Sequence, residues 1–199
     1  MHTEAVEFLQ FVKTILPSYF DKPLRVLDVG SGDINGNNRS LFHRDSEYHG
    51  NDMAPAKNVT IVSKTSELPF ADETFDVIVS SECFEHDPEY AKSLQKIVCM
   101  LKSDGLFFFT CASTGRREHG TRRTTPHDSY ATIAKNTDWQ DYYKNLTITD
   151  IADAIQLDTF ATRAAYYRKS TCDLYFYGVK TPNVSELPSF SGNTVSRVL

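Results

Sequence analysis

The sequence has only four cysteines, and none of them forms a C-x-x-C pair. Thiols at that spacing are typical of zinc sites and redox motifs, so neither is indicated here. The four residues, Cys83, Cys99, Cys111 and Cys172, are predicted to be reduced thiols of a cytosolic protein. We expect Cys99 and Cys111 to pack in the core.

A long apolar run and an excess of positive charge are also missing. No stretch is long enough to span a bilayer, so membrane insertion is not expected. Met1–Glu4 lack the basic and then apolar region of a secretion signal, which favours a cytoplasmic location. The net charge is −5, so the surface as a whole does not have the basic character of a nucleic-acid-binding protein, and DNA is not an expected partner.

The periodicity of the apolar residues predicts an ordinary α/β domain. The length of 199 residues and the hydrophobic content of 40% fit one globular unit. Helical spacing predicts helices over 4–16, 38–44, 88–102 and 147–157. Short apolar runs predict strands over 24–29, 47–52, 59–63, 75–80, 106–111, 160–167 and 173–179.

Two glycines directly follow the first predicted strand. Gly30 and Gly32 let the chain turn tightly and let a ligand approach the backbone. The next predicted strand ends in Asp52, about twenty residues on, where a doubly wound nucleotide-binding fold places a carboxylate for a ribose. The third glycine of the dinucleotide motif would fall at Asn35, so a dinucleotide site is not indicated.

Three separated blocks resemble class I S-adenosylmethionine-dependent methyltransferases. They are Asp28–Gly32 (D-V-G-S-G), Asp52, and Leu68–Val79 (L-P-F-A-D-E-T-F-D-V-I-V). The motifs Asn35-Gly36, Phe84–Asp87 (F-E-H-D) and Glu118–Arg122 (E-H-G-T-R) also resemble those of small type-11 methyltransferases associated with surface-polysaccharide synthesis. The resemblance covers roughly residues 24–112, with a looser echo to 180.

This resemblance and the order of the predicted elements imply a doubly wound α/β fold. We expect a mostly parallel seven-stranded sheet with helices on both faces and an antiparallel final strand. The methyltransferase domain is predicted to cover 1–181, with a substrate lid at about 113–146. Residues 182–199 are predicted to form a loosely ordered tail.

The resemblance implies S-adenosylmethionine as the cofactor and S-adenosylhomocysteine as its product. Backbone at Gly30 and Gly32 is expected to approach the amino-acid part, Asp52 to accept from the ribose hydroxyls, and Met53 to cover the adenine. The full predicted set is Asp28, Gly30, Ser31, Gly32, Asp52, Met53, Thr65, Ser66, Glu67 and Glu82. The alternative is that Asp28 and Asp52 only order their loops. Lys64 replaces an acid that the family often has near the adenine.

The predicted catalytic residues are His86, Asp87 and His127. His86 follows the fourth strand and is the leading candidate for a base near an acceptor hydroxyl, oriented by Asp87 or Glu85. The alternative is that Glu85 and His86 make only structural hydrogen bonds at the start of the next helix. Cys83 lacks the preceding proline of a cytosine C5 nucleophile and is expected to be inert.

A divalent metal is a second alternative at this place. Glu82, Glu85 and His86 match the E-x-x-E-H arrangement of some metal-dependent O-methyltransferases, and an ion there would lower the pKa of a bound hydroxyl. A further ligand would come from His119 or His127. We favour the reading in which Glu82 touches the cofactor and no metal binds.

Residues 113–146 are polar and show no clean period, which is typical of a functional segment. Six side chains there are predicted to contact the substrate: His119, Arg122, Arg123, Trp139, Tyr142 and Tyr143. Arginine and histidine suit phosphate or carboxylate, and the aromatic rings suit a sugar face. The alternative is a solvated loop whose arginines pack on acids.

Together these features predict an O-methyltransferase that acts on a sugar hydroxyl of a glycan or an activated sugar. The alternatives are another small molecule, an RNA 2′-hydroxyl, or a non-catalytic S-adenosylmethionine-binding partner subunit. The expected partner is a small-molecule or glycan acceptor. The chain is also compatible with one domain of a larger glycan-synthesis enzyme.

Overall fold

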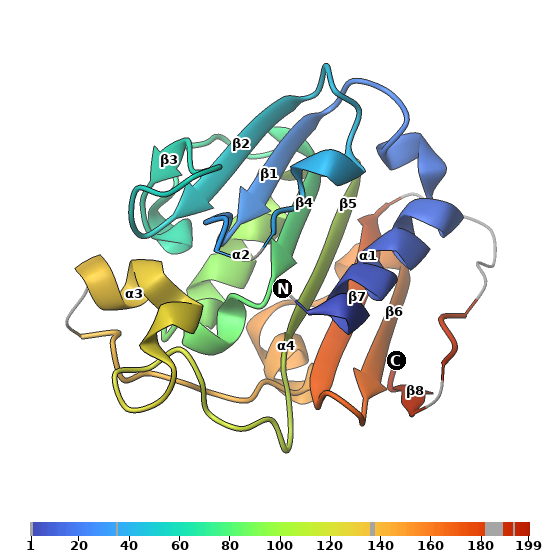
Figure 1. Cartoon of the computed structure of the whole chain (residues 1–199). Coiled ribbons are helices and arrows are strands. Elements are labelled where there is room, and N and C mark those ends of the chain that lie inside the picture. Colours follow the sequence, from blue (N-terminus) through green and yellow to red (C-terminus); the bar gives the residue numbers. More distant parts are fainter. Residues whose placement is uncertain (1, 35, 136–137, 182–188, 193) are drawn as a thin grey trace.

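The structure is a computed structural model that describes residues 2–34, 36–135, 138–181, 189–192 and 194–199 (Figure 1). The helices are α1 Thr3–Ile15, α2 Tyr90–Met100, α3 Tyr130–Lys135 and α4 Ile148–Ala154. The strands are β1 Arg25–Val29, β2 Glu47–Asp52, β3 Ile61–Val62, β4 Phe75–Ser81, β5 Leu101–Ala112, β6 Phe160–Arg168, β7 Asp173–Lys180 and β8 Val195–Arg197.

The strands form one eight-stranded sheet in the order β3-β2-β1-β4-β5-β7-β6-β8. Pairing is parallel from β3 to β5, whereas β7 is antiparallel to both β5 and β6. This order confirms the predicted doubly wound α/β fold with antiparallel strands at its C-terminal side. The prediction of seven strands was one short, because β8 pairs with the outer edge of β6.

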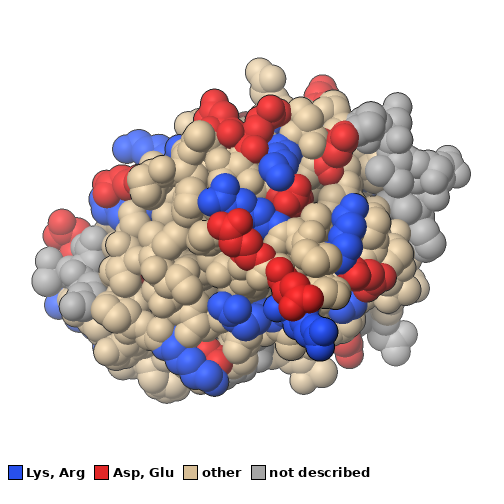
Figure 2. Space-filling model, turned by 90° about the horizontal axis from the view of Figure 1, so that it is seen from above, with Lys and Arg blue, Asp and Glu red and all other residues tan. Residues whose placement is uncertain are grey.

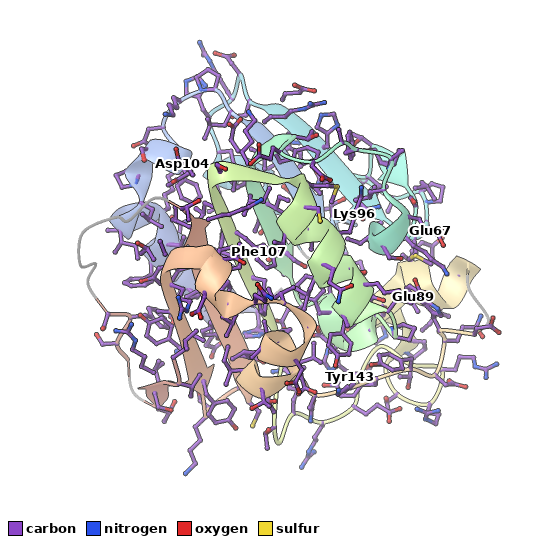
Figure 3. All side chains as sticks on the ribbon, turned by 180° about the vertical axis from the view of Figure 1, so that it is seen from behind. Glu67, Glu89, Lys96, Asp104, Phe107 and Tyr143 are labelled. Carbon is purple, nitrogen blue, oxygen red and sulfur yellow. The ribbon has the colours of Figure 1, made fainter. Side chains whose placement is uncertain are left out.

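Each face of the sheet carries its own hydrophobic core. Alternate residues of β5 point to opposite faces, as the two-residue period of a strand requires. Phe107 packs with residues of α2 and α4 on one face, and Figure 3 shows this face from behind. Phe108 packs on the other face with residues of α1 such as Phe8. Helices therefore cover both faces, as predicted.

The segment between β1 and β2 differs from the prediction of a helix over 38–44. Residues 38–44 are all described, and there Arg39–Leu41 form a single 3₁₀ turn. The Asp33 carboxylate accepts from the Gly36 amide at 3.0 Å and from the Asn37 side chain at 2.8 Å. These local bonds offer the backbone an alternative to helix, so no helix begins there to point at a ligand.

Smaller predictions were corrected as well. Cys99 is exposed rather than packed in the core, whereas Cys111 is buried. The predicted lid contains the short helix α3, although its sequence shows no clean period. Of the predicted loose tail, residues 182–188 and 193 lie outside the described residues, and Val195–Arg197 form β8.

The amino-end edge of the parallel strands carries both charge signs. Figure 2 shows Lys and Arg interspersed with Asp and Glu on this face. Arg25 and Glu47 form an ion pair of 3.2 Å across β1 and β2, and Lys102 and Asp76 form one of 2.8 Å. In the described part of the chain no helix is both long enough and apolar enough to cross a membrane.

Candidate active site

A cavity of about 450 Å³ opens at the carboxyl ends of β1, β2 and β4. In a doubly wound sheet this is the edge where ligands bind, and the volume is in the range of small-molecule sites. The lining comes from the loop after β1, the ends of β2 and β4, residues 116–119 and the start of α3. Segments far apart in the sequence thus share one cavity.

Asp28 orders the loop at the base of this cavity. It is 1% exposed, and its two oxygens accept hydrogen bonds from the Asn38 side chain at 2.9 Å and from the Tyr48 hydroxyl. Burial raises the pKa of Asp28 to about 6, although both hydrogen bonds oppose this shift. These contacts order the loop, and Asp28 also lines the cavity, so its role at the cofactor stays a prediction.

Asp52 ties the end of β2 to the glycine loop. Its carboxylate accepts from the Gly32 amide at 2.9 Å and from the Met53 amide at 2.7 Å. A Cβ at Gly32 would lie 2.8 Å from the Asp52 Oδ2 atom, so a side chain would displace the carboxylate. Each oxygen keeps a lone pair for a ligand, and Asp52 lines the cavity.

Of the residues predicted to lie near the adenine, some line the cavity and others do not. Met53, Thr65 and Trp139 line the cavity, and Thr65 donates to the Asn51 side chain at 2.9 Å. Ser66 and Glu67 do not line it.

Lys64 and its neighbours tie this end of the cavity to α2. Ser66 donates to Glu89 at 2.7 Å, and Lys64 pairs with Glu67 at 3.5 Å and with Glu89 at 3.3 Å. Figure 3 shows Glu67 and Glu89 on the same side of α2. The Lys64 ammonium also lies 5.3 Å from the Trp139 ring. The contacts of Lys64 therefore fix the segment after β3, and they do not supply the acceptor that the family often has near the adenine.

Glu82 lies in a charged group that joins three elements. The His2 Nε2 atom lies 3.5 Å from the Glu82 carboxylate and 2.9 Å from that of Asp173. Arg116 lies 3.4 Å from Asp173. The two acids outweigh the effect of burial and raise the pKa of His2 to about 10, so the ring is charged. The same contact lowers the pKa of Glu82 against the effect of burial.

Glu85, His86, His119 and Tyr143 form a second polar group. The His119 ring centroid lies 5.1 Å from that of His86 and 5.0 Å from that of Tyr143. His119 Nε2 lies 3.9 Å from the Glu85 carboxylate. Among the described residues, the buried Glu85 oxygens, His86 Nδ1 and the Tyr143 hydroxyl have no hydrogen-bond partner. Such groups are costly unless a ligand, water or ion satisfies them.

Protonation in this group follows burial. Burial and the Glu82 charge raise the pKa of Glu85 well above its usual range, which favours the neutral carboxyl. Burial lowers the pKa of His86 to about 3, so its ring is neutral near pH 7. His119 Nδ1 lies 3.2 Å from the Arg117 carbonyl oxygen. A carbonyl only accepts, so Nδ1 carries the hydrogen and Nε2 has the free lone pair.

The predicted metal ligands lie in different groups. Glu85 and His86 lie with His119, whereas Glu82 lies with His2 and Asp173. In each trio one ligand atom per residue lies within 4.8 Å of the others. Of the predicted ligands, Glu85 and His86 could therefore share an ion with His119, the further ligand that the sequence suggested, whereas, among the described residues, Glu82 could share one only with His2 and Asp173.

Asp87 lines the cavity but does not orient His86 through any hydrogen bond described for it. Its oxygens accept from the Glu89 amide at 2.7 Å and from Ser93 at 2.6 Å, which fixes the start of α2. His127 is 77% exposed and lies 3.4 Å from Asp128. His127 does not line the cavity.

The predicted substrate residues also divide into those at the cavity and those away from it. His119 and Trp139 line the cavity, and Tyr143 contacts His86 and His119 with its ring. Arg122 pairs with Asp141, and Arg123 pairs with Glu118 at 3.0 Å. Neither arginine lines the cavity, and Tyr142 does not either. The paired arginines match the alternative of a loop packed on its own acids.

Sequence reasoning missed several lining residues, among them His2, Asn38 and the stretch Asp128–Thr132. Asn38 follows a glycine loop and could have been inferred from its short polar side chain. Nothing local marks His2, because its neighbour Glu82 follows β4 and its neighbour Asp173 begins β7.

Comparison with protein families finds a match over residues 27–109 to a model described as a methyltransferase domain. This part of the chain is therefore similar to a methyltransferase domain. The matched range runs from β1 to β5 and contains the glycine loop, Asp52 and the residues after β4. No curated protein sequence matches the chain.

Solved structures share the fold of this domain. One is a 1,6-didemethyltoxoflavin-N1-methyltransferase from Burkholderia thailandensis, with 18% identity, a TM-score of 0.58, and coverage of 88% of this chain and 79% of that one. Another is a possible histamine N-methyltransferase from Thermotoga maritima, with 13% identity, a TM-score of 0.55 and 89% of each chain covered. A third is phosphoethanolamine N-methyltransferase 2 from Haemonchus contortus, with 17% identity, a TM-score of 0.58, and 89% of this chain and 53% of that one covered.

Proposed function

We propose that the protein is an S-adenosylmethionine-dependent methyltransferase that methylates a hydroxyl group of a small polar acceptor. The observation that carries this proposal is one cavity with two unlike ends. One end has the Gly32 and Asp52 arrangement that suits a nucleoside. The other end has neutral His86 beside His119, a setting that suits removal of a proton.

The residues present fit the cofactor. Asp52 keeps lone pairs for ribose hydroxyls, and Met53 and Thr65 border the place for adenine. When bound, S-adenosylmethionine supplies an electrophilic methyl group on a sulfonium. The protein's task is to hold the acceptor oxygen in line behind that group and to take up its proton.

We assign the base to His119 rather than to His86. His119 Nε2 has the free lone pair, and it takes the proton from the acceptor hydroxyl as the oxygen forms its bond to the methyl carbon. His86, with its pKa near 3, binds a proton too weakly to hold it. Its neutral ring can still accept a hydrogen bond and so position the hydroxyl. Tyr143 adds a buried hydroxyl beside both rings.

For the acceptor we favour a sugar hydroxyl of a glycan or an activated sugar. The aromatic Trp139 and Tyr130 line the cavity and offer faces on which a sugar ring can lie. An amine is the second candidate, because Glu82, Asp87, Glu118 and Asp128 make the lining acidic. Of the structurally similar proteins named above, two are N-methyltransferases and one is described as a possible N-methyltransferase, which is in line with this second candidate.

The test is a turnover assay that detects S-adenosylhomocysteine with panels of oligosaccharides, nucleotide sugars, amines and RNA. Turnover with a sugar supports the favoured acceptor, and turnover with an amine supports the second. An RNA acceptor would lose affinity steeply with salt. Binding of S-adenosylmethionine without turnover on any panel would favour the non-catalytic partner subunit.

The variant His119→Ala should lower kcat about 10²-fold or more, the usual contribution of a positioned base. His43→Ala is the matched control, because His43 does not line the cavity. Normal turnover by His119→Ala would exclude the assigned base. Loss of turnover in EDTA, with recovery on added Mg²⁺, would instead assign Glu85, His86 and His119 to a metal.

A further inference from the structure

The segment after β5 has a fixed backbone on both sides of Arg117. Before it, the Arg116 carbonyl oxygen accepts from the Asn145 side chain at 2.9 Å. After it, the chain packs so closely at Gly120 that an added Cβ would lie 2.6 Å from the His86 ring. Figure 1 shows the chain after β5 passing below the sheet toward α3. The neighbours of Arg117 therefore hold its backbone at the cavity.

Arg117 also lies beside the assigned base. Its carbonyl oxygen lies 3.2 Å from His119 Nδ1, and both residues line the cavity. Arg117 is exposed, so its long side chain is free to meet a ligand. An acceptor whose hydroxyl lies at His119 is therefore within reach of this guanidinium.

The guanidinium of Arg117 differs from the other arginines of this segment. Two arginines line the cavity in the described part of the chain, and Arg116 pairs with Asp173 at 3.4 Å. The arginines further along the segment pair with acids, as described above. For the Arg117 side chain, the described residues provide no hydrogen bond, ion pair or ring contact. Its donors therefore remain available to a ligand.

The acids of the same segment do not neutralise Arg117. Glu118 and Asp128 both line the cavity. Glu118 pairs with Arg123 at 3.0 Å, and Asp128 lies 3.4 Å from His127. A guanidinium that is left without an acid at the edge of a cavity favours an anionic ligand.

We propose that Arg117 binds an anionic group of the acceptor, a phosphate or a carboxylate, while a hydroxyl of the same acceptor lies at His119. A guanidinium can donate two parallel hydrogen bonds to either group. The proposal rests on the proposed function, because it names the class of acceptor for the same site. That class is a sugar with an anionic group, such as a nucleotide sugar or a uronic acid, rather than a neutral glycan or an amine.

The test measures binding of small anions to the full chain saturated with S-adenosylhomocysteine, so that the place of the cofactor is filled. Calorimetry should detect pyrophosphate if the group is a phosphate, or glucuronate if it is a carboxylate, and it should not detect methyl glucoside. Arg117→Gln should weaken binding of that anion about tenfold, as expected for lost charged hydrogen bonds. Arg117→Lys keeps the charge and should recover part of the affinity. Arg44→Gln is the matched control, because Arg44 does not line the cavity.

Binding of neither anion, or equal binding by Arg117→Gln and the unchanged protein, would overturn this inference and leave the proposed function standing. Weaker S-adenosylhomocysteine binding by Arg117→Gln would assign the residue to the cofactor and would overturn it as well. If the unchanged protein binds no S-adenosylhomocysteine, the proposed function fails too.

Turnover gives a second readout of the acceptor class. With an anionic sugar, Arg117→Gln should raise KM and leave kcat nearly unchanged, because the residue binds a group away from the reacting oxygen. A neutral sugar that both proteins methylate with the same KM would support the proposed function and contradict the anionic acceptor.

Discussion

Asp28 links the glycine loop to the pH dependence of stability. Its pKa in the folded protein is about 6, against 3.8 for an exposed group. The folded state therefore keeps a proton that the unfolded chain has already lost. Stability falls as the pH rises from 3.8 to 6, by about 3 kcal/mol in total for this group.

Tyr48→Phe should cost about 1.5–3 kcal/mol of unfolding free energy at pH 7.5, because the phenol donates to a charged carboxylate. The cost should be smaller at pH 4.5, where folded Asp28 carries its proton. Urea unfolding at both pH values measures the difference. Tyr19→Phe is the control, since Tyr19 donates to the backbone carbonyl of Asp104. An equal cost at both pH values for Tyr48→Phe would contradict the assignment.

Gly32→Ala should weaken S-adenosylhomocysteine binding about tenfold, because the new Cβ would lie 2.8 Å from Asp52 Oδ2 and displace the carboxylate. Calorimetry measures the change. Gly192→Ala is the matched control, because the nearest atom there lies 3.5 Å from the added Cβ. Unchanged affinity in Gly32→Ala would show that the position of Asp52 does not matter for binding.

Helix α4 is short and depends on its first turn. Thr147 accepts from the Asp150 amide at 3.3 Å, and the Asp150 side chain accepts from the Thr147 amide at 2.8 Å. This capping box satisfies two amides that the helix cannot. The Lys144 ammonium joins the same Asp150 carboxylate at 2.6 Å and the Tyr90 hydroxyl at 3.0 Å, so the cap also ties α4 to α2.

Thr147→Ala should lower the unfolding free energy by about 1 kcal/mol through the lost cap. Thr149→Ala, at an exposed position of the same helix, should change it much less. Chemical denaturation of both variants measures the two changes in unfolding free energy. Equal effects would mean that helix propensity, rather than the cap, sets the stability of α4.

Helices and strands with a clear local pattern of apolar residues were predictable from the sequence. Strand β4 is a continuous apolar run, and such a run is typical of a parallel strand that is covered on both faces. The turn at Arg39–Leu41 was not predicted, because the spacing of apolar residues does not reveal the local Asp33 hydrogen bonds that compete with helix. The exposed state of Cys99 was missed because its hydrophobic character alone suggested burial.

In the candidate site, the sequence motifs predicted the positions of residues that directly follow strands. They did not predict the positions of residues that come from other segments of the chain. Asp52 and Met53 follow β2 directly, so their position follows from that of the strand. The approach of His119 to Glu85, in contrast, depends on the path of the segment after β5. Arg122 and Arg123 were expected at the substrate, but acids within the same segment neutralise them.

Taken as a whole, the molecule should be stabilised by the ligand that fills its cavity. S-adenosylhomocysteine at about 100 times its Kd adds about 2.7 kcal/mol to the unfolding free energy. For a chain of this length that corresponds to a rise in Tm of about 5–11 °C. Calorimetric melting with and without ligand tests this. No rise at such a concentration would contradict cofactor binding in the cavity.

The docking of α1 on the far end of the chain has a consequence for biosynthesis. Phe8 stacks on Tyr175 with ring centroids 4.9 Å apart, and Glu7 pairs with Arg168, 161 residues later. At about 5–20 residues per second, the ribosome makes α1 roughly 8–32 s before Arg168. The apolar face of this helix must wait that long for the strands that cover it. Helix α1 is translated before the strands that cover it, so it is among the last segments to reach its native place, and His2 reaches the cavity with it.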